Sequence, residues 1–280
     1  MPGSPAPPLY QIETLAPGVF AAIATGFESF CNAAVVDLGG LVILFDTGQT
    51  PRAGRFLKRA ALTLTGRTPD LVVNSHGHFD HINGNAALAD SAILLSSATA
   101  HREILARALE LARAQSAPET ITTSLREVRA DLERRPNHPA AADWCLRAEY
   151  LAMLARNLPQ LRVCPPHVTF GKRLLLRGRH LTAVLESHSN AHSASDTVLS
   201  LPDVGVALMG DLGFSGEHRP PVSQERAGRW REILSLLRRS GCEIFLPGHG
   251  PVTDRSGLDQ MRAHLAHSSQ RAGSTHVNER

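Results

Sequence analysis

The stretch "NSHGHFDHING" places three histidines and one aspartate within six positions: His76, His78, Asp80 and His81. His76 and His78 are two residues apart, so in an extended segment their side chains point to the same side. Asp80 and His81 follow where the chain turns toward an expected helix. Imidazole and carboxylate groups suit zinc, and also iron or manganese. The stretch predicts a metal site whose two pairs could serve two neighbouring metals; the alternatives are a histidine-rich surface loop or a core histidine satisfied by the aspartate.

One loop cannot complete such a site, so further donors are expected at the ends of later strands. His192 precedes an apolar run in "SNAHSASDTVLSLP", Asp211 ends the run "GVALMGD", and His249 stands between two glycines in "EIFLPGHG". Glycine lets the backbone turn tightly near a ligand. Each residue alone is equally typical of a turn or a helix cap. Their common setting at strand ends predicts that they join the histidine stretch.

The elements that must position these residues form two β-rich halves. The first half contains short apolar or alternating runs separated by Pro-Gly and Gly-Gly, as in meandering strands. Residues 70–75 are expected to form a buried strand that ends at the histidine stretch. Strand-like runs return between residues 167 and 211, and helices are expected over 51–64, 223–239 and 257–267. The pattern predicts an α/β fold.

The two halves are separated by a helical insert at about residues 99–161. This segment is rich in Ala, Leu, Arg and Glu, with apolar residues at helical spacing, and two prolines interrupt it in "ERRPNHPAAAD". We expect two or three helices that cover the metal site and set the shape of its pocket. Their Ala-Leu-rich faces favour an apolar wall, and hence a substrate with an acyl or ring portion.

Composition limits the function classes. The 280 residues, 42% of them hydrophobic, are enough for one large domain or two small ones, and the net charge of +3 does not indicate a nucleic-acid or membrane surface. No run approaches the roughly 18 apolar residues of a membrane span. The four scattered cysteines form no CxxC pair. Because the first residues lack the pattern of a secretory signal, we expect a cytoplasmic protein with a small-molecule substrate; nothing indicates its oligomeric state.

Four motifs together resemble the metallo-β-lactamase-fold hydrolases. They are the HxHxDH run, the histidine four residues ahead of an aspartate in "HSASD", the "GD" after an apolar strand, and the final "PGHG". The resemblance extends from about residue 35 to 267, apart from the insert. It implies a four-layered αββα sandwich, with the metal site at one edge between the two sheets. Residues 1–280 would form a single domain of this fold, with the insert between its halves.

The resemblance also implies a ligand set for two metal ions, which we expect to be zinc. The implied ligands are, for the first metal, His76, His78 and His192; for the second, Asp80, His81 and His249; and, bridging both, Asp211. Asp46 in "FDTG" would support the histidine stretch without binding metal. Asp196 is expected either to act similarly or to cap its turn.

Metal chemistry then predicts a hydrolase. Water held by two cations loses a proton near neutral pH, whereas bulk water has a pKa of about 15.7. The hydroxide would attack the carbonyl of a small ester, lactone, thioester or β-lactam, with Asp80 orienting it and passing a proton to the leaving group. A true β-lactamase is the narrower expectation, because no export signal is visible. The alternatives are a mononuclear iron persulfide dioxygenase of the same fold and a non-catalytic metal-holding binding protein.

Three further residues are candidate substrate contacts. His218, on the long loop expected after the strand at 205–211, would line the mouth of the pocket. His188 could approach the site but also fits an exposed strand end. Tyr150 shares helical spacing with Leu146 and Leu154, which favours packing. The resemblance offers another role for Tyr150, because in lactonases of this fold a tyrosine from an inserted helix reaches the substrate carbonyl.

Overall fold

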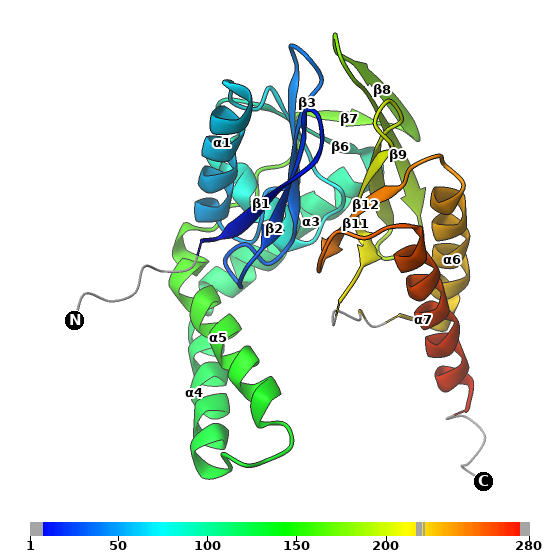
Figure 1. Ribbon diagram of the computed structural model, residues 1–280. Coiled ribbons are helices and arrows are strands. Elements are labelled where there is room, and N and C mark those ends of the chain that lie inside the picture. Colours follow the sequence, from blue (N-terminus) through cyan, green and yellow to red (C-terminus); the bar gives the residue numbers. More distant parts are fainter. Residues whose placement is uncertain (1–7, 217–219, 221, 275–280) are drawn as a thin grey trace.

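Two β-sheets lie at the centre of the molecule (Figure 1). The structure is a computed structural model, and it describes residues 8–216, 220 and 222–274. The first sheet has, in spatial order, β1 (Tyr10–Ala16), β2 (Val19–Ala24), β3 (Ala33–Asp37), β4 (Val42–Phe45), β5 (Leu71–Val73), β6 (Ile93–Ser97) and β7 (Val168–Phe170). The second has β12 (Ile244–His249), β11 (Val206–Phe214), β10 (Ser195–Leu201), β9 (Thr182–Ser189) and β8 (Arg173–Arg177).

Strand direction brings particular loops to one edge of the sandwich. Strands β1 to β4 form an antiparallel meander, whereas β4, β5, β6 and β7 are parallel neighbours. In the second sheet, β8 to β11 are antiparallel and β11 pairs with β12 in parallel. Parallel strands end at the same edge, so the segments that follow β4 and β5 lie together, as do the ends of β11 and β12.

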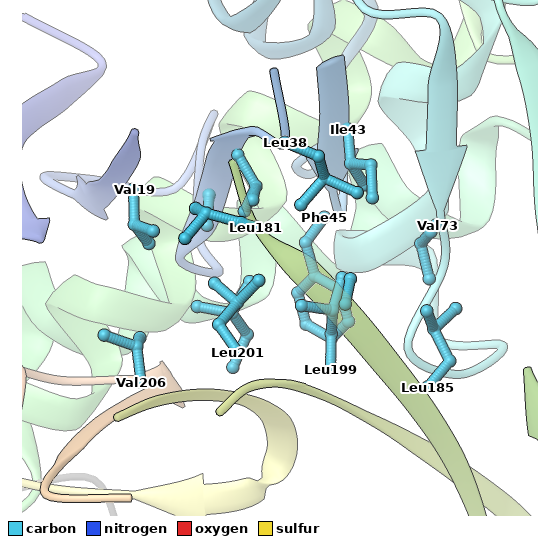
Figure 2. Close-up of a cluster of buried hydrophobic side chains, with 14 of the residues drawn as sticks. Val19, Leu38, Ile43, Phe45, Val73, Leu181, Leu185, Leu199, Leu201 and Val206 are labelled. Carbon is cyan, nitrogen blue, oxygen red and sulfur yellow. The ribbon is translucent and has the colours of Figure 1, made fainter. Parts of the chain in front are cut away.

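The core lies mainly between the two sheets. Figure 2 shows inward-facing side chains from both, including Ile43 and Phe45 of β4 and Leu199 and Leu201 of β10. These side chains are at most 2% exposed, and complete burial of each contributes about 1.5–3 kcal/mol. Alternate residues of each strand face the other way, toward a helical layer.

Helices cover both outer faces. The helix α1 (Pro51–Thr65) packs on the first sheet through a cluster that includes Leu57, and α6 (Gln224–Arg238) and α7 (Arg255–Ser274) pack on the second through Trp230 and Leu265. The N-cap of α1 is Thr50, whose side chain accepts a hydrogen bond from the amide of Ala53. The order of layers is helix, sheet, sheet, helix (Figure 1), which confirms the predicted αββα sandwich.

The insert consists of three helices and a short 3-10 turn: α3 (Ala98–Ser116), α4 (Glu119–Arg134), α5 (Ala141–Asn157) and η2 (Leu158–Gln160). Buried Ala100 and Ile104 lie on α3, whereas α4 has no buried residue. The hairpin of α4 and α5 extends away from the sheets (Figure 1), so α3 and the inner end of α5 are the parts near the sandwich. Within the described ranges, every helix is too short or too polar to cross a membrane.

Candidate metal centre

The predicted ligand residues meet at the edge where the parallel strands end. His76 follows β5, and Asp80 and His81 lie in the four-residue helix α2 (Phe79–Ile82), which continues into the 3-10 helix η1 (Asn83–Ala87). Asp211 lies in β11 and His249 ends β12. The side chains form two groups, in each of which the ligand atoms lie within 4.8 Å of one another: His76, His78, His192 and Asp211; and Asp80, His81 and His249.

Asp211 connects the two groups through different oxygens. Its Oδ2 lies 3.2 Å from Nε2 of His192 and 3.8 Å from Nε2 of His76. Its Oδ1 lies 3.1 Å from Nε2 of His81 and 3.4 Å from Nε2 of His249. One carboxylate oxygen therefore faces each group, as a carboxylate that bridges two cations requires.

Within each group, the other distances between ligand atoms are also those of side chains that could bind one metal ion. In one group, Nε2 of His192 is 3.0 Å from Nδ1 of His78. In the other, Oδ2 of Asp80 is 3.4 Å from Nε2 of His81 and 3.3 Å from Nε2 of His249. Nε2 of His76 is buried and has no hydrogen-bond partner within the described part of the chain. An unpaired buried donor or acceptor lowers the stability of the fold by about 1–3 kcal/mol. A cation bound to Nε2 of His76 would remove this penalty.

Burial and mutual charge set the protonation of these groups. Burial, reinforced by His192, lowers the pKa of His78 to about 4, and burial likewise holds the pKa of His76 well below its ordinary value. Burial alone would raise the pKa of Asp80 and Asp211, but the neighbouring histidines outweigh it and hold both pKa values well below normal. Neutral imidazoles and ionised carboxylates are the forms that bind metal.

His249 behaves differently. Burial would lower its pKa, but the carboxylates of Asp211 and Asp80 outweigh burial and raise the pKa to about 10. Its Nε2 must therefore lose a proton when a cation binds. The set as a whole, five imidazoles and two carboxylates, suits zinc and related divalent cations.

Comparison with known proteins agrees with this geometry. The family model described as the metallo-beta-lactamase superfamily matches residues 26–249. The chain belongs to the metallo-β-lactamase superfamily. Among solved structures, its fold is similar to a metallo-beta-lactamase from Pontibacter korlensis, with a TM-score of 0.63, 14% identity, and 92% of this chain and 99% of that chain covered.

A second similar structure is the metallo-beta-lactamase FIM-1 from Pseudomonas aeruginosa in the mono-zinc form. Its TM-score is 0.62 and its identity 16%, with 95% of this chain and 98% of that chain covered. A metallo-beta-lactamase from Erythrobacter litoralis gives a TM-score of 0.60 at 13% identity, covering 92% and 97%. At these low identities, the TM-scores show a shared fold. A search of curated protein sequences gave no significant match.

Asp46 lies outside both donor groups of this superfamily member. Its Oδ2 accepts a 2.7 Å hydrogen bond from Nδ1 of His81, and its Oδ1 accepts a 2.8 Å bond from the amide of Ser75. The Asp46 backbone adopts a left-handed φ of 59° where β4 ends. The contact fixes the imidazole of His81 so that Nε2 faces the donor group.

Asp196 contacts the backbone beside a ligand histidine. Its carboxylate accepts bonds of 3.0 and 3.1 Å from the amide of Ser193 and one of 2.7 Å from the Ser193 hydroxyl. This is the arrangement of a residue that caps a turn. Asp196 therefore holds the turn directly after His192.

The loop of residues 30–32 supports the second group, although no sequence motif indicated it. Nδ1 of His249 donates to the carbonyl of Phe30 at 3.1 Å, and Sγ of Cys31 donates to the carbonyl of Asp80 at 2.9 Å. Nδ2 of Asn32 donates to the carbonyl of Pro247 at 2.9 Å. These partners are 49 to 219 positions away in the sequence. No short sequence pattern indicates such long-range contacts. The available signal was the pair Cys31–Asn32, which stands directly before an apolar run.

Tyr150 packs as its helical spacing indicated, but also against another part of the chain. It shares a pocket lining with Leu154, whereas Leu146 is 56% exposed. The ring of Tyr150 lies 6.0 Å from that of Phe27 and 6.1 Å from that of Phe30, measured between centroids. Burial and the charge of Asp80 raise the pKa of Tyr150, which keeps its phenol protonated.

The two other candidate contacts are His188 and His218. Ser187 of β9 bonds across to Ser195, so the adjacent His188 points to the opposite face of the sheet, where Arg229 of α6 is a charged neighbour. An approach of His188 to the site therefore stays a prediction. His218 lies outside the described residues.

Proposed function

We propose that this chain is a dinuclear metal-dependent hydrolase, with zinc as the metal and a small carbonyl compound as the substrate. The substrate class comprises esters, lactones, thioesters and β-lactams. The observation that carries the proposal is the orientation of Asp211, whose two oxygens face two separate groups of histidines. Zinc is further supported by the similar structure FIM-1, which was solved in a mono-zinc form.

Seven side chains would hold the cations. His76, His78 and His192 would hold one, and Asp80, His81 and His249 the other, with Asp211 between them. When bound, two such cations would supply Lewis acidity, which lowers the pKa of water and polarises a carbonyl oxygen.

Asp80 is the residue to which we assign proton transfer. Its side chain is 15% exposed, compared with 8% for Asp211, so Asp80 is the carboxylate more open to a substrate. It is ionised at neutral pH because His81 and His249 outweigh the effect of burial on its pKa. A free lone pair of its carboxylate would accept a proton from the attacking water and then deliver it to the leaving group.

The test combines metal analysis with turnover. Protein purified without chelator and reloaded with zinc is assayed on chromogenic esters, thioesters, lactones and cephalosporins. We expect two zinc ions per chain, turnover of at least one class, and loss of turnover after chelation or in His76→Ala. His267→Ala is the matched control, because His267 is an exposed residue of α7.

Two outcomes would overturn the proposal. One iron per chain together with oxygen uptake on a persulfide substrate would identify a mononuclear dioxygenase instead. Zinc-loaded protein that turns over none of the four classes, yet binds one of these compounds tightly, would identify a binding protein.

A further inference from the structure

A pocket of about 160 Å³ lies beside the metal centre, between the α2–η1 segment and the insert. Its apolar lining comes from Phe79, Leu111 of α3, Leu154 of α5, Leu158 and Leu161, and two polar residues, Gln49 and Glu110, also line it. A cavity of roughly 150 Å³ with such apolar walls accommodates a benzene ring. The size and lining of the pocket therefore suit an apolar group of about six carbon atoms.

Asn83 lines this pocket with an unpaired amide. The residue is 1% exposed, and neither Nδ2 nor Oδ1 has a hydrogen-bond partner in the ranges that the structure describes. The nearby Asn85 is equally buried, but its Nδ2 donates to Oδ1 of Asn74 at 2.8 Å and its Oδ1 accepts from Nδ2 of Asn74 at 3.1 Å. Burial of an unpaired amide is costly, so a donor and an acceptor are held ready for a ligand.

The pocket adjoins the second donor group. Phe79 and Asn83 are four residues apart, on one face of the helical turn that carries Asp80 and His81 between them. Tyr150 also lines the pocket, and its ring contacts Phe30. The ring of Phe30 in turn lies 5.3 Å from that of His249. Tyr150 and Phe30 therefore connect the lining of the pocket with the second donor group.

We infer that this pocket binds an apolar side group of the substrate, about the size of a benzene ring, and that Asn83 hydrogen-bonds an amide next to that group. The N–H of a secondary amide can donate to Oδ1 of Asn83, or its C=O can accept from Nδ2. Because a trans amide turns these two groups in opposite directions, it makes one of the two bonds at a time. The inference rests on the proposed function, because it names the side group of the compound hydrolysed at the metal centre.

The first test measures binding without turnover, by calorimetric titration of zinc-loaded protein. The probes are N-benzylacetamide, which has both the ring and the amide, and N-methylacetamide, which lacks the ring. We expect N-benzylacetamide to bind at least about tenfold more tightly, because burial of the ring adds apolar area. Equal affinities would overturn the inference.

Variants then test each part of the pocket. Leu154→Trp should fill the pocket and abolish binding of N-benzylacetamide, whereas Leu109→Trp, on an exposed position of α3, should leave it unchanged. Asn83→Leu should weaken binding of N-benzylacetamide by up to about tenfold, since it removes the amide that makes the hydrogen bond. It should also raise the melting temperature, because it replaces an unpaired buried amide with an apolar group.

A merely structural role for Asn83 predicts the opposite stability result. If Asn83→Leu lowered the melting temperature and left binding unchanged, the inference would be overturned. Binding by the wild type, lost in Leu154→Trp, together with no turnover of any carbonyl substrate would support the pocket but contradict the hydrolase. If the turnover rate did not depend on the side group of the substrate and was unchanged in Leu154→Trp, the hydrolase would be supported but the pocket inference overturned.

Discussion

The two donor groups differ in how the rest of the chain supports them. In the second group, every ligand has a partner outside the centre: Asp46 accepts from His81, the Phe30 carbonyl accepts from His249, and Cys31 donates to the backbone of Asp80. Asp46 directly follows β4, and Phe30 and Cys31 lie in the loop before β3. The second group is therefore positioned before a cation arrives.

The first group depends more on contacts among its own members. Oγ of Ser75 lies 2.9 Å from Nδ1 of His76, and Nη1 of Arg226 donates to the backbone carbonyl of His192 at 3.1 Å. His78 and His192 are half-buried and lie with ring centroids 4.8 Å apart. The two groups of one ligand set are therefore supported unequally. Changes to supporting residues should act mainly on the second group.

Asp211→Asn should have the largest effect, because it removes the charge that both groups share. An amide cannot offer an anionic oxygen to each side, so we expect a loss of metal affinity beyond the roughly 10–100-fold that supporting residues cost. Metal content after dialysis against a weak chelator measures this. Asp203→Asn, on a surface turn where the carboxylate accepts from the Thr182 amide, is the matched control. Retention of one tightly held metal would show that Asp211 serves one group only.

Asp46→Asn should separate the two groups. The asparagine amide can donate to Nδ1 of His81, which would place the imidazole proton on the nitrogen that faces the cation. We expect the affinity of the second group to fall about 10–100-fold while that of the first changes little. A stepwise titration with a competing chelator resolves the two affinities. An equal fall in both would contradict the unequal support described above.

The ligand residues were predictable from sequence, whereas their support was only partly so. His192, Asp211 and His249 each lie where an apolar run meets a polar residue and a turn, so a local pattern marks them. The contacts of the 30–32 loop depend on which distant strand ends meet it, and this follows from sheet order rather than from any short motif. For Tyr150, helical spacing indicated a packing role, but not that this face of the helix meets Phe27 and Phe30.

Gly54→Ala should disturb the second group indirectly, through the 3-10 helix η1. A Cβ atom at Gly54 in α1 would lie 2.3 Å from the carbonyl oxygen of Gly84, in the 3-10 helix that follows Asp80 and His81. We expect a loss of stability of about 1–3 kcal/mol, as for other overpacked sites, with a several-fold weaker second metal. Gly228→Ala in α6 meets nothing within 4 Å and should instead stabilise the protein by about 0.5–1 kcal/mol. Denaturant unfolding distinguishes these signs; stabilisation by both changes would refute the close packing.

Ser75→Ala should have the smallest effect and should act on the first group. The hydroxyl lies 2.9 Å from Nδ1 of His76 but 3.4 Å from Nδ1 of His81, whose stronger partner is Asp46 at 2.7 Å. A neutral hydrogen bond contributes about 0.5–1.5 kcal/mol, which corresponds to a two- to tenfold weaker first metal. The same chelator titration measures it, with Ser96→Ala as a buried control whose hydroxyl donates to the Ser97 carbonyl. The effect should be small because the imidazole of His76 is already enclosed by His78, His81 and His192. A loss confined to the second metal would show that Ser75 supports the second group instead of the first.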